Sequence, residues 1–212
     1  LCSEGMLGWL AFDEAEGREA LDRSREMIRE IEARVRRRAV VFPTGNEVVA
    51  GQIVDTNTPL IRARLEREGY HVDERPPLAD DRLLIEAALR AAVLDEGYGL
   101  VVTSGGVGAE TKDCTIEALQ GVDSRASVPY ICRFEKGQGR HAKDGVRIGV
   151  GRAGTALLLS LPGPNDEVEP GLEAALSALA EDGEPAEIAS AVAAVLRERL
   201  TEKMRDHHGA EA

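Results

Sequence analysis

The sequence is poor in the residues that mark several common classes of protein. Aromatic residues make up 3% of the 212 positions, so a core must be built mainly from Ala, Val, Leu and Ile. The three cysteines, Cys2, Cys114 and Cys132, stand far apart with no C-x-x-C pair, which argues against a zinc site. Scattered cysteines in an odd number are typical of reduced thiols in a cytoplasmic protein. The four histidines form no ligand-spaced set either.

Positive charge is also scarce. The chain has 26 Lys and Arg against 38 Asp and Glu, a formal net charge of -12. This balance argues against duplex nucleic acid as a partner and against an anionic membrane surface. No apolar run reaches the roughly 18 residues of a membrane span, and no signal segment is present. An acidic protein can still bind a phosphorylated small molecule through backbone amides.

The amino-terminal part differs in pattern from the rest. Residues 1–12 are apolar, and we expect them to pack on this domain, on another subunit or on an upstream domain. Because the first residue is Leu, we expect a piece of a longer protein. Residues 13–38 have the period of a helix. We expect its apolar stripe to dock on a core, through Leu21, Ser24, Ile28, Ile31 and Val35.

Strands and helices alternate along the remainder. The pattern predicts strands at 39–45, 70–76, 99–104, 128–134, 146–151 and 155–163. It predicts helices at 56–68, 80–97, 113–120, 166–181 and 185–206, with 207–212 frayed. The fold class is therefore a three-layer α/β/α arrangement with a mostly parallel sheet and an amino-terminal helical extension. We divide the chain into an extension (1–38), an α/β domain (39–182) and a carboxy-terminal helix and tail (183–212).

Three loops that follow predicted strands carry glycines, amides and acids. They are "PTGNEVVAGQIVDTN" at 43–57, "TSGGVGAETKDCT" at 103–115 and "LPGPNDE" at 161–167. Ligands of such sheets bind at the carboxyl ends of the strands, where these loops should meet. Backbone amides can hold phosphate oxygens there, and a carboxylate can hold Mg²⁺.

Each feature also has a purely structural interpretation. A glycine-rich turn between a strand and a helix can serve packing alone. Asp113 can cap the helix that follows it, and Asp55 and Asn57 can cap the helix at 56–68. The stretch "GVGRAG" at 149–154 fits a dinucleotide fingerprint but is followed by a strand, so we interpret it as a turn between antiparallel strands. Neither a Walker A lysine motif nor a G-x-S-x-G elbow occurs.

Taken in order, the three loops and the "DD" at 80–81 resemble the molybdopterin-binding domain of molybdenum-cofactor biosynthesis proteins. That family includes molybdopterin adenylyltransferases, molybdate-insertion enzymes and the amino-terminal domain of CinA-type proteins. The resemblance covers about Val40 to Leu176. It implies molybdopterin as a substrate or ligand, Mg²⁺, and ATP or AMP as a further ligand. It also implies a small-molecule partner, with no nucleic acid or membrane, and a homotrimer.

The resemblance also implies a site. Asp113 and Asp55 would be the catalytic acids, and Asp113 and Glu47 would hold the metal. The cofactor-binding set would be Thr44, Gly45, Asn46, Glu47, Asn57, Ser104, Gly105, Gly106, Val107, Gly108, Pro162, Gly163 and Pro164. This chain departs from many members of the family at Asn46, where they have an acid, and at Lys112, where they have Arg.

Residues 133–147 look like an inserted hairpin. Its Arg140, His141 and Lys143 could reach a terminal phosphate of a ligand, and an exposed charged hairpin is the alternative. Three functions stay open at this point. One is Mg²⁺-dependent adenylyl transfer from ATP to molybdopterin, with largely electrostatic catalysis. The second is a module that binds molybdopterin or a nucleotide without turnover. The third is a CinA-like nucleotide pyrophosphatase, because "EVVAGQIVDTN" is closer to CinA-type sequences.

Overall fold

The structure, a computed structural model, describes residues 13–135 and 142–209, and the chain divides into two compact units, 1–34 and 35–212. Helix α1 (Glu14–Arg36) has no buried residue, and Leu21, Ile28 and Ile31 are 54–58% exposed. The docking predicted for this stripe, on a core that belongs to the second unit, stays a prediction. Helical periodicity identifies an apolar face but not what covers it. The predicted packing of residues 1–12 lies outside the described residues, and the three predicted domain boundaries stay predictions.

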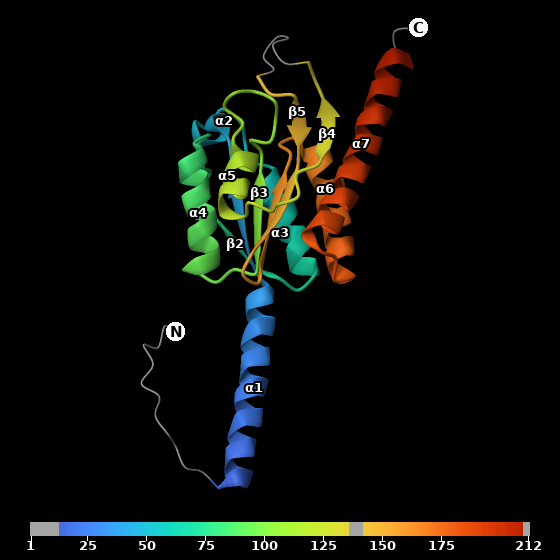
Figure 1. Cartoon of the computed structure of the whole chain (residues 1–212). Coiled ribbons are helices and arrows are strands. Elements are labelled where there is room, and N and C mark those ends of the chain that lie inside the picture. The colour runs from blue at the N-terminus through green and yellow to red at the C-terminus, as the bar shows by residue number, and fades with distance from the viewer. Residues whose placement is uncertain (1–12, 136–141, 210–212) are drawn as a thin grey trace. The chain divides into compact units, whose positions relative to one another are not determined.

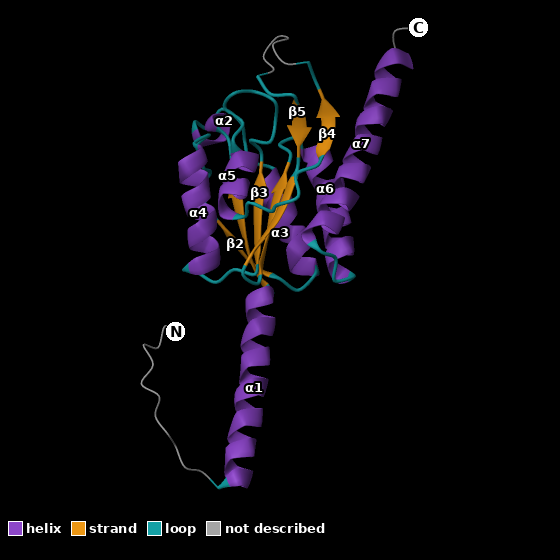
Figure 2. Cartoon of the chain, in the orientation of Figure 1, coloured by secondary structure: helices purple, strands orange, loops and turns teal. Residues whose placement is uncertain are grey.

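The second unit is built on a five-stranded sheet of order β2-β1-β3-β7-β6 (Figure 1). Strands β1 to β3 and β7 are parallel, and β6 is antiparallel to β7. This confirms the mostly parallel sheet. The strands are β1 (Arg38–Pro43), β2 (His71–Glu74), β3 (Leu100–Ser104), β6 (Gly149–Ala153) and β7 (Ala156–Leu161). The helices are α2 (Asn46–Val49), α3 (Asn57–Arg67), α4 (Arg82–Leu94), α5 (Thr115–Val122), α6 (Asn165–Ala180) and α7 (Pro185–Gly209) (Figure 2).

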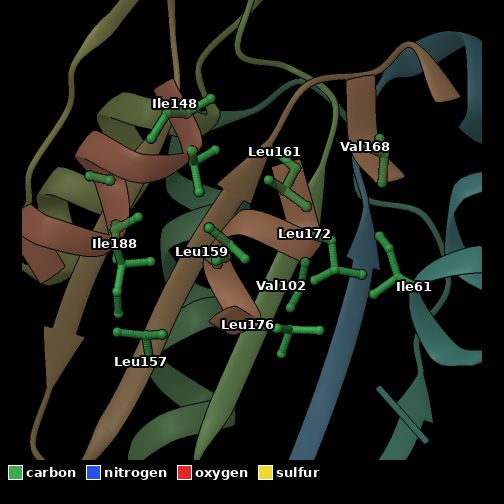
Figure 3. Close-up of a cluster of buried hydrophobic side chains, with 14 of the residues drawn as sticks. Ile61, Val102, Ile148, Leu157, Leu159, Leu161, Val168, Leu172, Leu176 and Ile188 are labelled. Carbon is green, nitrogen blue, oxygen red and sulfur yellow. The ribbon is translucent and has the colours of Figure 1, made fainter. Parts of the chain in front are cut away.

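Alternation along the strands sends side chains into two helical layers. On β1, Ala39 and Val41 belong to a cluster with residues of α3, α6 and α7, whereas Val40 and Phe42 pack with residues of α4 and α5. Strand β3 alternates in the same way. Figure 3 shows the larger cluster, which contains Ile61, Val102, Ile148, Leu159, Leu161, Leu172 and Ile188. Both faces of the sheet are covered by helices, which confirms the three-layer α/β/α fold.

The stretch predicted as one strand at 146–151 is in fact two strands. Strand β5 (Gly145–Arg147) pairs antiparallel with β4 (Tyr130–Arg133) in a separate two-stranded sheet. The chain then passes through the buried Ile148 and enters β6. Apolar alternation predicts extended backbone, but it does not tell which strand will be the partner.

Two smaller predictions have opposite outcomes. The "GVGRAG" stretch does lead into an antiparallel pair, because β6 turns at Gly154 (φ +59°) and returns as β7. The predicted fraying from residue 207 is wrong for 207–209, which continue α7, while 210–212 lie outside the described residues. Among the helices described, none has the length and apolarity that a membrane crossing requires.

Candidate functional site

The three predicted loops leave the sheet at the same level. Pro43 at the end of β1 is in register with Ser104 at the end of β3, and Ser104 is in register with Leu161 at the end of β7. The backbone continues this alignment one residue further, since Thr44 donates to Ser104 O at 2.9 Å and Gly105 donates to Leu161 O at 3.1 Å. The loops therefore start side by side at the carboxyl edge of the sheet, where parallel α/β folds bind ligands.

The glycines of the second loop permit close approach of neighbouring backbone and side chains. A Cβ on Gly105 (φ +104°) would lie 2.4 Å from Thr44 O, and one on Gly106 (φ +62°) would lie 2.2 Å from Thr115 Oγ1. A Cβ on Gly108 would lie 2.4 Å from Asp113 Oδ2. The packing interpretation of these glycines is thus correct. It does not exclude a ligand, because glycine is also the residue that lets a backbone approach one.

The same loop offers backbone donors. Among the described residues, no acceptor is found for the N–H groups of Gly106, Val107 and Gly108. Three successive N–H groups in a loop of this kind form an arrangement that suits an anion. The loop then leads into α5, where Thr115 donates to Gly106 O at 3.0 Å and closes the turn.

Asn57 joins the three loops. Its Nδ2 donates to Ser104 Oγ at 2.8 Å and to Gly163 O at 2.7 Å, and its Oδ1 accepts from Asn165 Nδ2 at 3.1 Å. One amide side chain thereby satisfies a partner in each of the other two loops. Its role is structural in the geometry described, and it lies at the centre of the predicted site.

Asp55 and Asp113 accept hydrogen bonds from different parts of the backbone. Asp55 Oδ1 accepts from the N–H groups of Asn57 and Thr58, both at 3.0 Å, so it caps the start of α3 as the structural interpretation predicted. Asp113 does not cap α5, because its Oδ2 instead accepts from Glu110 N–H at 2.8 Å and the cap position is Cys114. Burial raises the pKa of Asp113. Its Oδ1 has no hydrogen-bond partner within the described residues.

Glu47 and Asn46 lie at the start of α2. Lys112 Nζ from the second loop donates to Glu47 Oε1, and this hydrogen bond lowers the pKa of Glu47. Asn46 and Asp80 form a reciprocal pair: Asp80 Oδ2 accepts from Asn46 N–H at 3.0 Å, and Asn46 Oδ1 accepts from Asp80 N–H at 3.1 Å. An aspartate at position 46 would bring a second carboxylate against Asp80, which gives a local reason for the departure from the family pattern.

These residues enclose a cavity of about 250 Å³. Ten of the predicted site residues line it: Thr44, Gly45, Glu47, Asp55, Asn57, Ser104, Gly105, Gly106, Asp113 and Gly163. Sequence reasoning did not assign Asp80 and Lys112 to the site, although both line this cavity. The "DD" at 80–81 was a signal for Asp80, but Asp81 is the residue that caps α4. In the part of the chain described, no group of three or more His, Cys, Asp or Glu side chains is arranged to hold a metal.

A second, more apolar cavity of about 420 Å³ adjoins the first and shares Gly106, Asp113 and Gly163 with it. Four predicted residues line this cavity and not the first: Val107, Gly108, Pro162 and Pro164. Asn46 lines neither cavity. The predicted set is therefore distributed over two adjoining compartments, with Asp113 at the boundary.

The hairpin at 133–147 contributes Phe134 and Val146 to the lining of the second cavity, and its basic side chains support the second loop. Lys143 Nζ donates to Asp113 O. It also donates to the two carboxylate oxygens of Glu117, at 2.9 Å each, and Arg147 donates to Glu117 Oε1 at 2.7 Å. Burial raises the pKa of Glu117, but the hydrogen bond from Lys143, a backbone hydrogen bond and the charges of Lys143 and Arg147 together outweigh burial and leave the pKa lowered. Lys143 lines neither cavity, and Arg140 and His141 lie outside the described residues.

A protein-family model described as the probable molybdopterin binding domain matches residues 40–181. A CinA-like protein of Fervidobacterium nodosum is 35% identical over 83 residues, which are 39% of this chain and 20% of that protein. The chain thus spans about a fifth of the length of this curated relative. The solved structure of the protein CinA from Thermoplasma acidophilum is 26% identical, with a TM-score of 0.51, and 69% of this chain covers 97% of it. The Mog protein of Mycobacterium ulcerans is 26% identical, with a TM-score of 0.55, and 69% of this chain covers 96% of it.

Proposed function

Because the chain belongs to the family of probable molybdopterin binding domains, we propose that the cavity at the ends of β1, β3 and β7 binds molybdopterin or its adenylated form in molybdenum-cofactor biosynthesis. The observation that carries this proposal is the second loop. It combines the N–H groups of Gly106, Val107 and Gly108, which have no acceptor within the described residues, with the carboxylate of Asp113. N–H groups suit the phosphate of the pterin, and a carboxylate oxygen that accepts no hydrogen bond from the described residues suits Mg²⁺.

The finer proposal is adenylyl transfer. An oxygen of the molybdopterin phosphate would attack the α-phosphorus of ATP, the bond from that phosphorus to the bridging oxygen would break, and pyrophosphate would leave. Asp113, whose Oδ1 has no hydrogen-bond partner within the described residues, would hold Mg²⁺, which would neutralise charge on the phosphates, and Glu47 would be the second acid. Asp55 is engaged in capping α3, so in this proposal it orients Asn57. Catalysis would consist mainly of positioning and charge neutralisation.

The test is to incubate the purified chain with molybdopterin, ATP and Mg²⁺ and to separate the products. We expect adenylated molybdopterin and an equal amount of pyrophosphate. Tight binding of molybdopterin without AMP transfer would reduce the proposal to a binding module. If molybdopterin and its adenylated form both fail to bind, the proposal is wrong.

The curated relatives favour one further candidate. Proteins named CinA-like, such as one from Anaeromyxobacter dehalogenans, reach 40% identity over 84 residues. The alternative is therefore a CinA-like nucleotide pyrophosphatase that uses the same cavity. Release of AMP from ADP-ribose, in the absence of any molybdopterin, is the result that would favour it over adenylyl transfer.

We also propose that the chain assembles into a homotrimer, as the family resemblance implies. The apolar stripe of α1, with Leu21, Ile28 and Ile31, supports association, because an isolated helix is only marginally stable in water and is stabilised when such a stripe is buried. We expect sedimentation equilibrium of the whole chain to give three times the monomer mass, and Ile28→Asp to weaken the assembly about tenfold or more. A wild-type chain that sediments as a monomer would refute both parts. Val54→Asp, a change of another exposed apolar residue, is the control.

A further inference from the structure

The main cavity contains an ion pair with which an incoming phosphate must compete. Lys112 Nζ donates to Glu47 Oε1, and the pair links the second loop to the first, 65 positions earlier in the chain. The side chains of Lys112 and Glu47 are 38% and 39% exposed. Both charges can thus be reached from solvent, so the pair can exchange partners without unfolding the loops.

The balance of charges around the cavity determines how strongly this ion pair affects the binding of a phosphate. Among the described residues that line the cavity, Lys112 is the one basic side chain, and it is opposed by the carboxylates of Glu47, Asp55, Asp80 and Asp113. Each aspartate already accepts a backbone N–H: Asp55 from Thr58, Asp80 from Asn46 and Asp113 from Glu110. Among the described residues, Glu47 is the one carboxylate at hydrogen-bond distance from Lys112, since the nearest Glu110 oxygen is 3.8 Å away.

A phosphate that enters alone would therefore meet an excess of negative charge. Lys112, the cation that the described lining supplies, is neutralised by Glu47, and like charges at close range are unfavourable. The backbone N–H groups of the second loop can solvate phosphate oxygens, but they carry no net charge. A divalent cation is the group that reverses this balance, because it binds carboxylate and phosphate oxygens together.

We propose that Lys112 is the side chain that recognises the ligand's phosphate, and that Glu47 occupies it until a divalent cation arrives. On binding, Lys112 exchanges Glu47 for a phosphate oxygen, and the released carboxylate joins the cation. Glu47 is thus both a competitor of the phosphate and a ligand of the metal. This inference rests on the proposed phosphate ligand of the cavity, and it adds Lys112 as a specificity-determining residue and a requirement for the cation at the binding step.

The experiment is a calorimetric titration of the whole chain with inorganic pyrophosphate, at constant ionic strength, with Mg²⁺ or with Na⁺ alone. Glu47→Gln removes the competing charge and keeps a hydrogen-bond acceptor, whereas Lys112→Met removes the cation. The matched controls are Glu173→Gln, which breaks the ion pair with Arg64 on another surface, and Lys203→Met, which breaks the pairs with Asp166 and Glu167. A charge-assisted hydrogen bond corresponds to about a tenfold change or more in affinity.

For the wild type we expect binding that is about tenfold or more tighter with Mg²⁺ than with Na⁺. Glu47→Gln should raise the affinity in Na⁺ by about tenfold and reduce the gain from Mg²⁺, and Lys112→Met should lose about tenfold or more in Mg²⁺. The controls should match the wild type. The inference is wrong if Glu47→Gln binds no tighter in Na⁺ than Glu173→Gln does, if Lys112→Met binds like Lys203→Met, or if pyrophosphate binds to neither the wild type nor Glu47→Gln.

The experiments can distinguish a failure of this inference from a failure of the proposed function. If pyrophosphate shows the expected pattern but molybdopterin and its adenylated form do not bind, the exchange of partners stands and the pterin proposal falls. If molybdopterin binds and its affinity is unaffected by Glu47→Gln and Lys112→Met, the proposed function stands and this inference falls.

Discussion

Asp113→Asn should lower the rate of adenylyl transfer by about 100- to 1000-fold while leaving the fold at least as stable as the wild type. The asparagine Oδ1 can still accept the N–H of Glu110, which Asp113 accepts at 2.8 Å. The lost feature is the charge at the boundary of the two cavities, where Asp113 lines both. Steady-state kinetics with molybdopterin and ATP, together with thermal unfolding, measure the two effects separately.

The expected stability follows from the pKa of Asp113. Burial raises this pKa, which means that the ionised carboxylate is less favourable in the folded chain than in the unfolded chain. Its contribution to stability is therefore full below the unfolded-state pKa and is lost as the pH rises through the folded-state pKa. At neutral pH the charge costs stability, so the neutral asparagine should be neutral or slightly stabilising. A cost in stability retained for chemistry is typical of functional residues.

Glu117→Gln provides the contrasting case. Its carboxylate is paired with Lys143 and Arg147 and has a lowered pKa, so its contribution to stability is present at neutral pH and is lost as the pH falls. We expect this variant to lose about 1–2 kcal/mol at neutral pH. If Asp113→Asn retains wild-type activity, or loses as much stability as Glu117→Gln, then Asp113 is a structural residue and the site assignment is wrong.

The sequence alone supported the fold because its strongest signals are local. Apolar runs such as Leu100–Val102 predict central strands, and the order of strands and helices predicts a parallel sheet with loops gathered at one edge. The position of the cavity follows from this topology. The division of 146–151 into two strands could not be predicted in the same way, because the pairing of β4 with β5 depends on contacts between distant segments.

The details of the site depend on side-chain pairs that no local pattern encodes. Lys112 and Glu47 meet across 65 positions, and Asn46 and Asp80 across 34. The resemblance implied a catalytic role for Asp55, and its position also predicted a helix cap. In the structure, Asp55 accepts hydrogen bonds from the first turn of α3. The periodic apolar stripe of α1 predicted the helix correctly, but it names no surface that would cover the stripe. In each case the sequence predicts the chemical character of the residue, whereas the tertiary fold determines which residue it contacts.

Gly105→Ala should lower the free energy of unfolding by about 3–5 kcal/mol. Two costs combine at this position. The backbone has a φ of +104°, which a residue with a side chain rarely adopts, and the new methyl group would lie 2.4 Å from Thr44 O. Because Thr44 O belongs to backbone that is in register with β3, the clash can be relieved only by moving the first loop away from the second. Urea unfolding measures the loss.

Gly154→Ala separates the two costs. Gly154 also has a positive φ, +59°, but a Cβ there would meet nothing within 4 Å, so the strain acts alone. We expect a loss of about 1–2 kcal/mol for this control. Gly163→Ala, whose nearest contact would be an ordinary 3.8 Å to Gly105, should be close to neutral. Equal stabilities of Gly105→Ala and Gly154→Ala would show that the loops are not tightly apposed. If Gly105→Ala fails to fold while Gly154→Ala and Gly163→Ala fold, the first two loops are tightly apposed. Their close contact is then required for folding as well as for the cavity.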